Sequence, residues 1–88
     1  MTVYVDDAGV LKDGRKWYHL AADTVEELHA FAERIGLKPE WFQEKNYPHY
    51  DVTKYKRNQA LREGARYVST RVLLRVLQKK YGRKEGIE

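Results

Sequence analysis

The chain has 88 residues, of which 42% are apolar and 34% charged, and it contains no cysteine. This length fits a single core, and the composition is typical of a folded protein. The absence of cysteine excludes disulfides, thiolate zinc sites, iron–sulfur clusters and cysteine nucleophiles. We expect one domain over residues 1–82, followed by a frayed basic tail over residues 83–88.

The net charge of +4 conceals an uneven distribution. Residues 1–52 hold six Lys/Arg and ten Asp/Glu, whereas residues 53–88 hold eleven Lys/Arg and three Asp/Glu. A basic half of this kind favours contact with a polyanion such as a nucleic acid. The N-terminus lacks the pattern of a signal peptide, and no segment approaches the roughly 20 apolar residues of a membrane-spanning helix. We therefore expect a cytoplasmic protein that does not contact membranes.

The first half of the chain predicts two strands and a helix. Residues 2–6 alternate with a period of two, and residues 17–22 form a second candidate strand. The intervening segment predicts a loop or a loose hairpin at Asp13-Gly14. Residues 23–26 indicate a helix start with Asp23 as the cap, and Gly36 would end this helix.

The second half predicts further strands and helices in alternation. Pro39 would open a short helical turn, and Trp41 and Phe42 would then plug the edge of the core. Residues 49–52 predict a short strand, followed by a helix that Thr53 or Asp51 could cap. Residues 65–69 predict another strand, and a last helix would run to Gly82. This alternation favours an α/β fold with three to four short, largely parallel strands and about three helices.

Polar residues follow or interrupt the predicted strands. If the strands are parallel, Asp6, Asp51 and Ser69 converge at the carboxyl ends, with His19 or His49 nearby. Carboxylate and imidazole groups suit Mg²⁺, Mn²⁺ or Zn²⁺. We therefore predict that the metal ligands come from Asp6, His19, His49 and Asp51.

In this prediction His49 and Asp51 are also the candidate catalytic residues, with His49 acting as a ligand or as an acid–base group. Each residue has a simpler alternative role. Asp51 could cap the following helix, and His49 could be a loop residue that binds the backbone. Asp6 could belong to a turn, and His19 could be a half-buried strand residue. Ser69 is expected to cap the last helix, because its surroundings do not match a G-x-S-x-G nucleophile motif.

Basic residues on the last two predicted helices could hold phosphates. Arg71, Arg75 and Lys79 are spaced by four and would form one ridge on a helix, which could follow a phosphate backbone without reading sequence. The candidate phosphate-binding residues are Lys56, Arg57, Arg71, Arg75 and Lys79. Exposed helices are also rich in Lys and Arg for solubility alone, so a solvated surface is the alternative.

Several segments together resemble a known family. These segments are "VYVDDA", "WYHLAADTVEELHAFAERIGL", "WFQ", "HYDVT" and "ALREGARYVSTRVLLR". From about Thr2 to Arg75 the chain resembles the domain-of-unknown-function 4031 family of short bacterial and bacteriophage proteins. The resemblance implies a small cytoplasmic protein, in the host cytoplasm if phage-encoded, and it implies no particular activity. The matching polar positions are Asp6, His19, Asp23, His29, His49, Tyr50 and Asp51.

Two functions are compatible with these observations. The first is a nucleotide- or nucleic-acid-binding protein whose Asp/His site holds a divalent metal and supports phosphoester hydrolysis. The second is a non-enzymatic accessory protein that binds a host protein or forms a homodimer through apolar helix faces.

Overall fold

The computed structural model describes residues 2–82, so the expected tail over residues 83–88 lies outside the described residues. Ten elements follow one another along the chain. They are β1 (Val3–Val5), β2 (Val10–Lys12), β3 (Arg15–Ala22), α1 (Val25–Arg34), the 3₁₀ helix η1 (Pro39–Trp41), β4 (Phe42–Gln43), β5 (His49–Val52), α2 (Lys54–Arg62), β6 (Arg66–Tyr67) and α3 (Thr70–Tyr81). The α/β class and the three helices agree with the prediction.

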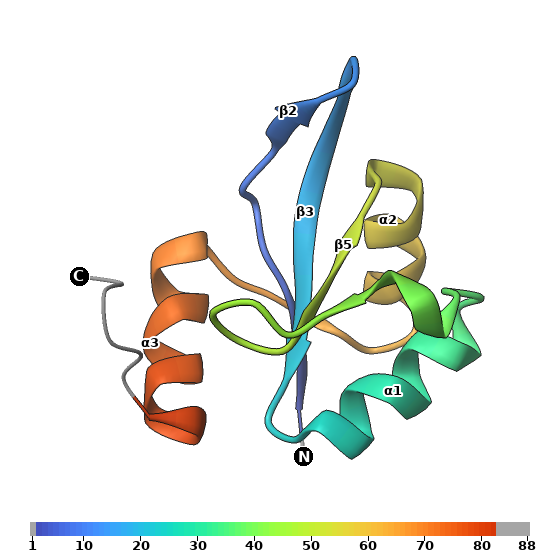
Figure 1. The fold of residues 1–88 in the computed structure, drawn as a ribbon. Helices are drawn as coiled ribbons and strands as arrows, with labels where there is room; N and C mark the ends of the chain where they lie inside the picture. Colours follow the sequence, from blue (N-terminus) through green and yellow to red (C-terminus); the bar gives the residue numbers. More distant parts are fainter. Residues whose placement is uncertain (1, 83–88) are drawn as a thin grey trace.

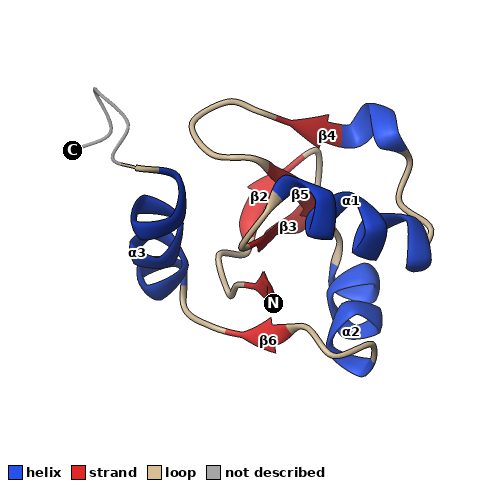
Figure 2. Ribbon diagram, turned by 90° about the horizontal axis from the view of Figure 1, so that it is seen from below, coloured by secondary structure: helices blue, strands red, loops and turns tan. Residues whose placement is uncertain are grey.

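The helices lie on both sides of a central sheet. Figure 1 shows α3 on one side of the strands and α1 and α2 on the other, and the view from below in Figure 2 shows the same three layers. The larger core lies between the sheet and the helices α1 and α2, where Leu20, Leu28 and Val52 are almost completely buried. A smaller core under α3 contains Leu73 and Leu77 of that helix.

The sheet is mostly antiparallel, so the prediction of largely parallel strands is wrong. Its order is β4-β5-β3-β1-β6, with β2 paired to β3 beside this path. Only the β1–β6 pairing is parallel among the described strands. The reason is that β1 and β2 both pair with the long strand β3 as one extended hairpin, and β4 reverses the chain before β5. Both β2 and β4 are too short to give a clear periodic pattern in the sequence.

The helix starts use side-chain caps, and only that of α1 differs from the predicted one. Thr24 Oγ1 accepts the Glu27 backbone N–H at the start of α1, and Thr53 Oγ1 accepts the Lys56 N–H at the start of α2. Asp23 instead accepts the Tyr4 hydroxyl. Asp51 is therefore not the cap of α2, because it lies within β5 and its side chain points elsewhere.

The end of α1 and the start of the short helical turn after it agree with the prediction. Of the two aromatic residues predicted to pack at the core edge, Phe42 does so and Trp41 does not. Gly36 follows α1 with a positive φ of 80°, a conformation that glycine adopts without strain. The 3₁₀ helix begins at Pro39 as expected. Phe42 packs against the larger core. Trp41, however, is 46% exposed and does not plug the core edge.

Along the central strand β3, alternate side chains point to the two opposite faces of the sheet. Tyr18 and Leu20 are buried in the larger core below α1 and α2. Trp17 and His19 lie on the opposite face, because successive residues of a strand point to opposite sides. Helix α3 covers only part of that face, since Ala21 is the β3 residue in the smaller core. Within residues 2–82, no helix is long and apolar enough to cross a membrane.

Candidate functional site: a histidine–carboxylate cluster on the sheet face

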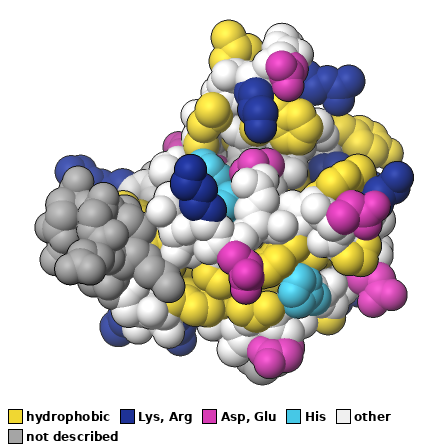
Figure 3. Space-filling view, in the orientation of Figure 1, with side chains coloured by type: hydrophobic (Ala, Val, Ile, Leu, Met, Phe, Trp, Pro, Cys, Tyr) yellow, Lys and Arg dark blue, Asp and Glu magenta, His cyan; other side chains and the backbone are white. Residues whose placement is uncertain are grey.

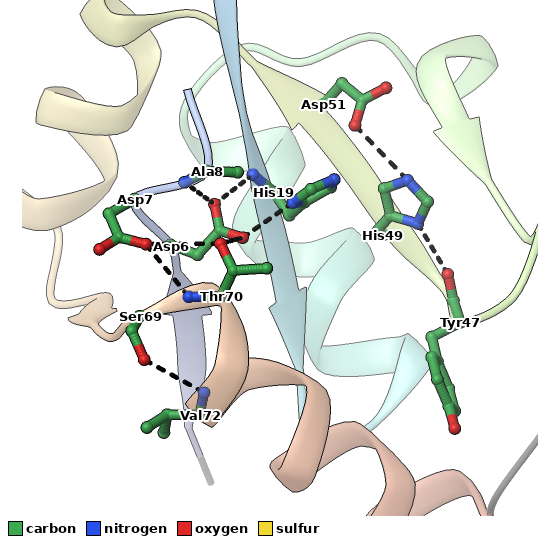
Figure 4. A network of polar contacts seen from close by, with 10 residues as sticks. All are labelled: Asp6, Asp7, Ala8, His19, Tyr47, His49, Asp51, Ser69, Thr70 and Val72. Atoms are coloured by element: carbon green, nitrogen blue, oxygen red, sulfur yellow. Dashed lines mark hydrogen bonds and ion pairs between the residues drawn. The ribbon is translucent and has the colours of Figure 1, made fainter. Parts of the chain in front are cut away.

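Asp6 is the one fully buried charged residue among the described residues, and its carboxylate accepts four hydrogen bonds. Oδ1 accepts the backbone N–H groups of His19 at 2.9 Å and Ala8 at 3.2 Å. Oδ2 accepts Nδ1–H of the His19 ring at 2.8 Å and the Thr70 hydroxyl at 3.0 Å. These contacts, drawn in Figure 4, use the lone pairs of both oxygens. Asp6 is therefore positioned to orient other groups rather than to bind a metal directly.

The hydrogen bonds of Asp6 outweigh the effect of its burial. Burial alone raises the pKa of this carboxyl, but the bonds from the His19 ring, the His19 N–H and the Ala8 N–H lower it below its usual value. The neighbouring Asp7 accepts the Thr70 backbone N–H, so two successive aspartates hold the first residue of α3. Negative charge at this position is favourable, because a helix N-terminus has a partial positive charge.

His19 lies in the middle of β3, directly opposite Asp51 of β5 in the antiparallel ladder. Because Nδ1–H of His19 is donated to Asp6, Nε2 is the ring atom that remains available as an acceptor or ligand. In Figure 4 this second nitrogen points toward His49 and Asp51. The hydrogen bond to Asp6 is also the main reason that the pKa of His19 is raised, since it stabilises the protonated ring.

His49 is held in a matching way by the backbone. Its Nδ1 lies 2.7 Å from the Tyr47 carbonyl oxygen, and this ring nitrogen must donate because a carbonyl oxygen can only accept. Nε2 then faces Asp51 Oδ1 at 3.4 Å. A neutral His49 would therefore present a lone pair to a carboxylate oxygen. A metal ion could be held by these two atoms, because an imidazole nitrogen and a carboxylate oxygen are both metal ligands.

Asp51 completes a cluster of three side chains. One ligand atom from each of His19, His49 and Asp51 lies within 4.8 Å of the other two, and all three side chains are partly accessible. Ligand atoms around a tetrahedral metal are roughly 3.3–3.5 Å apart, given bonds of about 2.0–2.2 Å. Small side-chain rotations would therefore bring the three atoms to coordination distance.

A hydrogen bond from Gln43 also holds the carboxylate of Asp51 in place. Gln43 of β4 donates its side-chain N–H to Asp51 Oδ2 at 2.6 Å, which leaves Oδ1 toward the histidines. The pKa of Asp51 is lowered mainly by its interaction with His49, and the bond from Gln43 adds to this effect against a smaller opposing effect of burial. Asp51 is therefore held as an ionised carboxylate beside two imidazoles.

The structure brings the four predicted ligand residues together, but only Asp6 lies at the carboxyl end of a strand, directly after β1. His19 and Asp51 are cross-strand neighbours in the middle of antiparallel strands, so the predicted convergence at parallel carboxyl ends is wrong. Asp6 lies behind His19 and contacts it from the smaller core side. Ser69 does not join the cluster; its hydroxyl accepts the Val72 N–H and caps α3, as expected.

The predicted phosphate-binding residues are distributed over two helices. The Lys56 ammonium donates to the Ile35 carbonyl and to Gln59, and the Arg57 guanidinium lies 4.3 Å from the centre of the Tyr18 ring. Both cations therefore have partners within the fold. The ridge of α3 is exposed and consists of Arg71, Arg75 and Lys79. Its contact with phosphates stays a prediction.

Three residues that support the cluster have no clear signal in the sequence. Gln43 belongs to a two-residue strand, Tyr47 contributes a backbone carbonyl to the cluster, and Thr70 is the first residue of a helix, with no motif around it. The sequence did contain a pattern that places Trp17 beside the cluster. Trp17 is two residues before His19 in a strand, so the period of two places both on the same face.

The fold and the cluster together define a small mixed α/β protein with two histidines and a carboxylate on a partly open sheet face. The chain belongs to the protein family of unknown function DUF4031, whose model matches residues 3–80. This membership confirms the resemblance stated above. No curated protein and no solved structure shows a significant match to the chain.

Proposed function

We propose that the protein binds a divalent transition metal through His19, His49 and Asp51 and uses it to hydrolyse phosphoesters. The observation that supports this most is the direction of the two rings. Each histidine donates Nδ1–H to a fixed acceptor, Asp6 or the Tyr47 carbonyl, so Nε2 is left for the metal. A histidine that binds a metal almost always donates its other ring nitrogen to a carboxylate or a carbonyl in this way.

The donor set favours Zn²⁺ or Mn²⁺ over Mg²⁺. Imidazole is a good ligand for Zn²⁺ and other transition metals, whereas Mg²⁺ requires mainly oxygen ligands and six-fold geometry. Three protein ligands also match the composition of catalytic zinc sites, in which water takes the fourth position. The predicted Mg²⁺ is therefore the least favoured of the three ions.

The proposed reaction is the attack of a water molecule on phosphorus. A metal ion lowers the pKa of its bound water to about 7 and neutralises charge on the phosphoryl oxygens. The water would lose one proton to solvent as its oxygen forms a bond to phosphorus, the bond from phosphorus to the ester oxygen would break, and the released alkoxide would take up a proton from solvent. In this proposal His49 is a ligand rather than an acid–base group, because both ring nitrogens are then occupied.

The first prediction concerns metal binding by Asp51→Asn. We expect Zn²⁺ to bind the wild-type protein in calorimetric titration and to raise its melting temperature, because a ligand of the folded state stabilises it. Asp51→Asn removes the only anionic ligand, so affinity should fall by more than the roughly 10–100-fold typical of outer-layer substitutions. Asp13→Asn is a matched control, since Asp13 is an exposed turn residue outside the cluster, and its positive φ is one that asparagine also adopts.

Hydrolysis is tested separately with bis(p-nitrophenyl) phosphate in the presence of Zn²⁺ or Mn²⁺. We expect release of p-nitrophenolate by the wild type and by Asp13→Asn, and none above background by Asp51→Asn. An unchanged melting temperature and no heat of binding with any of the three ions would refute the metal site. Metal binding without hydrolysis would refute only the enzymatic part.

The alternative function, binding of a host protein or homodimerisation, stays a prediction. Among the described residues, Val72 and Leu74 of α3 are exposed apolar side chains that such a contact could use. Sedimentation of the purified protein over a range of concentrations would distinguish a monomer from a homodimer.

A further inference from the structure

An open cavity of about 640 Å³ lies beside the cluster. Its size falls within the range of roughly 300–1,000 Å³ that small-molecule sites occupy. Asp51 and Gln43, the hydrogen-bonded pair described above, form part of its wall. His19 and His49 line a separate cavity of about 160 Å³ on their other side. Asp51 is the member of the cluster that lines the larger cavity, so the candidate metal position adjoins this cavity through Asp51.

The wall of this cavity is unusually aromatic. Trp17, Trp41 and Tyr55 line it, and the first two are the only tryptophans of the chain. Trp41 is 46% exposed and Tyr55 is 71% exposed, so large parts of both rings are open to solvent. Exposed aromatic rings at a cavity are suited to stacking on planar ligands, and nucleobases stack on them regardless of base identity.

Cations lie near these rings. Lys12 and Arg15 are exposed cross-strand neighbours at the tip of the β2–β3 hairpin, and both line the cavity. Lys56 also lines it but donates to the Ile35 carbonyl, so Lys12 and Arg15 are the cations available to a ligand. Glu40 is the carboxylate of the wall other than Asp51. In Figure 3 basic, apolar, histidine and carboxylate surfaces adjoin one another on this face.

Three side chains of β3 connect the hairpin tip, the cavity wall and the cluster. Arg15, Trp17 and His19 are alternate residues of one strand, so they share a face and are about 7 Å apart along it. A cation, an aromatic ring and a candidate metal ligand therefore follow one another in a line. A nucleotide unit with both a 5′ and a 3′ phosphate, as in a strand, has a matching set of groups, because its planar base then lies between two phosphates.

We propose that the phosphoester substrate is a nucleotide unit, whose base stacks on Trp17 and Trp41 while its phosphate lies at Asp51 and the metal. This inference rests on the proposed function, because it assigns the substrate of the same site. Lys12 and Arg15 would contact a second phosphate, on the other side of the base, and Glu40 could accept a hydrogen bond from a sugar hydroxyl. The shared chemistry is a base next to a phosphoester, which a free nucleotide or the end of a single strand can supply.

The test uses the two tryptophans as reporters. Titration with AMP should quench the tryptophan fluorescence of the Zn²⁺-loaded protein, whereas inorganic phosphate should not. Trp41→Ala should weaken AMP binding by roughly 5- to 150-fold, the range expected for one stacked base. Trp17→Phe is a second variant that keeps an aromatic ring and should reduce affinity less than Trp41→Ala. Zn²⁺ affinity should be unchanged in both variants, since neither residue is a ligand.

Matched controls separate stacking from charge. Tyr67→Ala removes an exposed aromatic ring that does not line the cavity and should leave AMP binding unchanged. Lys12→Gln should weaken binding of adenosine 3′,5′-bisphosphate, which has a second phosphate, but not of AMP, and Lys16→Gln, on the opposite face of the same hairpin, should affect neither. Comparison of AMP with a short single-stranded oligonucleotide shows which source of the ligand binds more tightly.

The outcomes are distinguishable from those of the proposed function. Hydrolysis of the chromogenic ester with AMP affinity unchanged in Trp41→Ala and Trp17→Phe would overturn the nucleotide assignment and leave the metal-dependent activity standing. Absence of quenching by both AMP and the oligonucleotide would also overturn it. Quenching by AMP in a protein that binds no metal would refute the proposed function but support the base-binding cavity.

Discussion

The buried carboxylate of Asp6 has a role that differs from the one expected for it. It was a predicted metal ligand, yet it accepts four hydrogen bonds and contacts the cluster only through His19. A carboxylate in this position fixes the ring orientation of a histidine ligand and increases its basicity. In the proposed site Asp6 is therefore a positioning residue and not a ligand.

This role predicts the behaviour of Asp6→Asn. The amide keeps the size of the carboxylate but loses its charge and one acceptor, so His19 is held less firmly. We expect Zn²⁺ affinity to fall by roughly 10–100-fold in calorimetric titration, with binding still detectable. Asp7→Asn, next to it but without a bond to His19, serves as the control. A complete loss of binding in Asp6→Asn with a folded protein would instead indicate a direct ligand.

At the scale of single residues, the sequence predicted which side chains form the cluster better than how they meet. His19, His49 and Asp51 were all candidates, because each belongs to a predicted strand and has a side chain that can bind a metal. Their contact depends on the register of β3 against β5, which places His19 opposite Asp51. Register is set by tertiary packing and turn geometry, so local spacing could not reveal it.

The elements show the same division between local and long-range information. Helix ends were predicted well, because Gly36, Gly64 and Gly82 each follow a helix with a positive φ. The predicted cap of α1 was Asp23, whereas the observed cap is Thr24. For α2 the prediction allowed Asp51 or Thr53, and the observed cap is Thr53. The strand directions were mispredicted because β2 and β4 have only two or three residues each, too few for a periodic pattern.

The start of α2 provides a prediction at the scale of one element. Thr53 Oγ1 accepts the Lys56 N–H, so Thr53→Ala should lower the free energy of unfolding by about 1 kcal/mol. Thr53→Ser keeps the hydroxyl and should have a much smaller effect. Urea denaturation monitored by circular dichroism measures both variants. If Asp51→Ala lowered stability by this amount while Thr53→Ala did not, Asp51 would be the cap after all.

The molecule as a whole is stabilised chiefly by the core below α1 and α2. Leu20 is fully buried there on the central strand. Leu20→Ala should lower the free energy of unfolding by roughly 2–5 kcal/mol, since it removes buried methyl groups and leaves a cavity. Leu11→Ala is a matched control at a site that is 72% exposed, and it should change stability by no more than about 0.5 kcal/mol. Similar losses in both variants would contradict this assignment of the core.

The short strands that complicated prediction have one more consequence. β4 and β6 border the described sheet and have two residues each, and β2 beside the main path has three. A border strand exposes unpaired backbone groups on which a neighbouring chain can add a strand, and very short border strands limit this template. The described sheet is thus poorly suited to growth by strand addition. Any contact between two copies of this domain would have to use its side-chain surfaces rather than a shared backbone ladder.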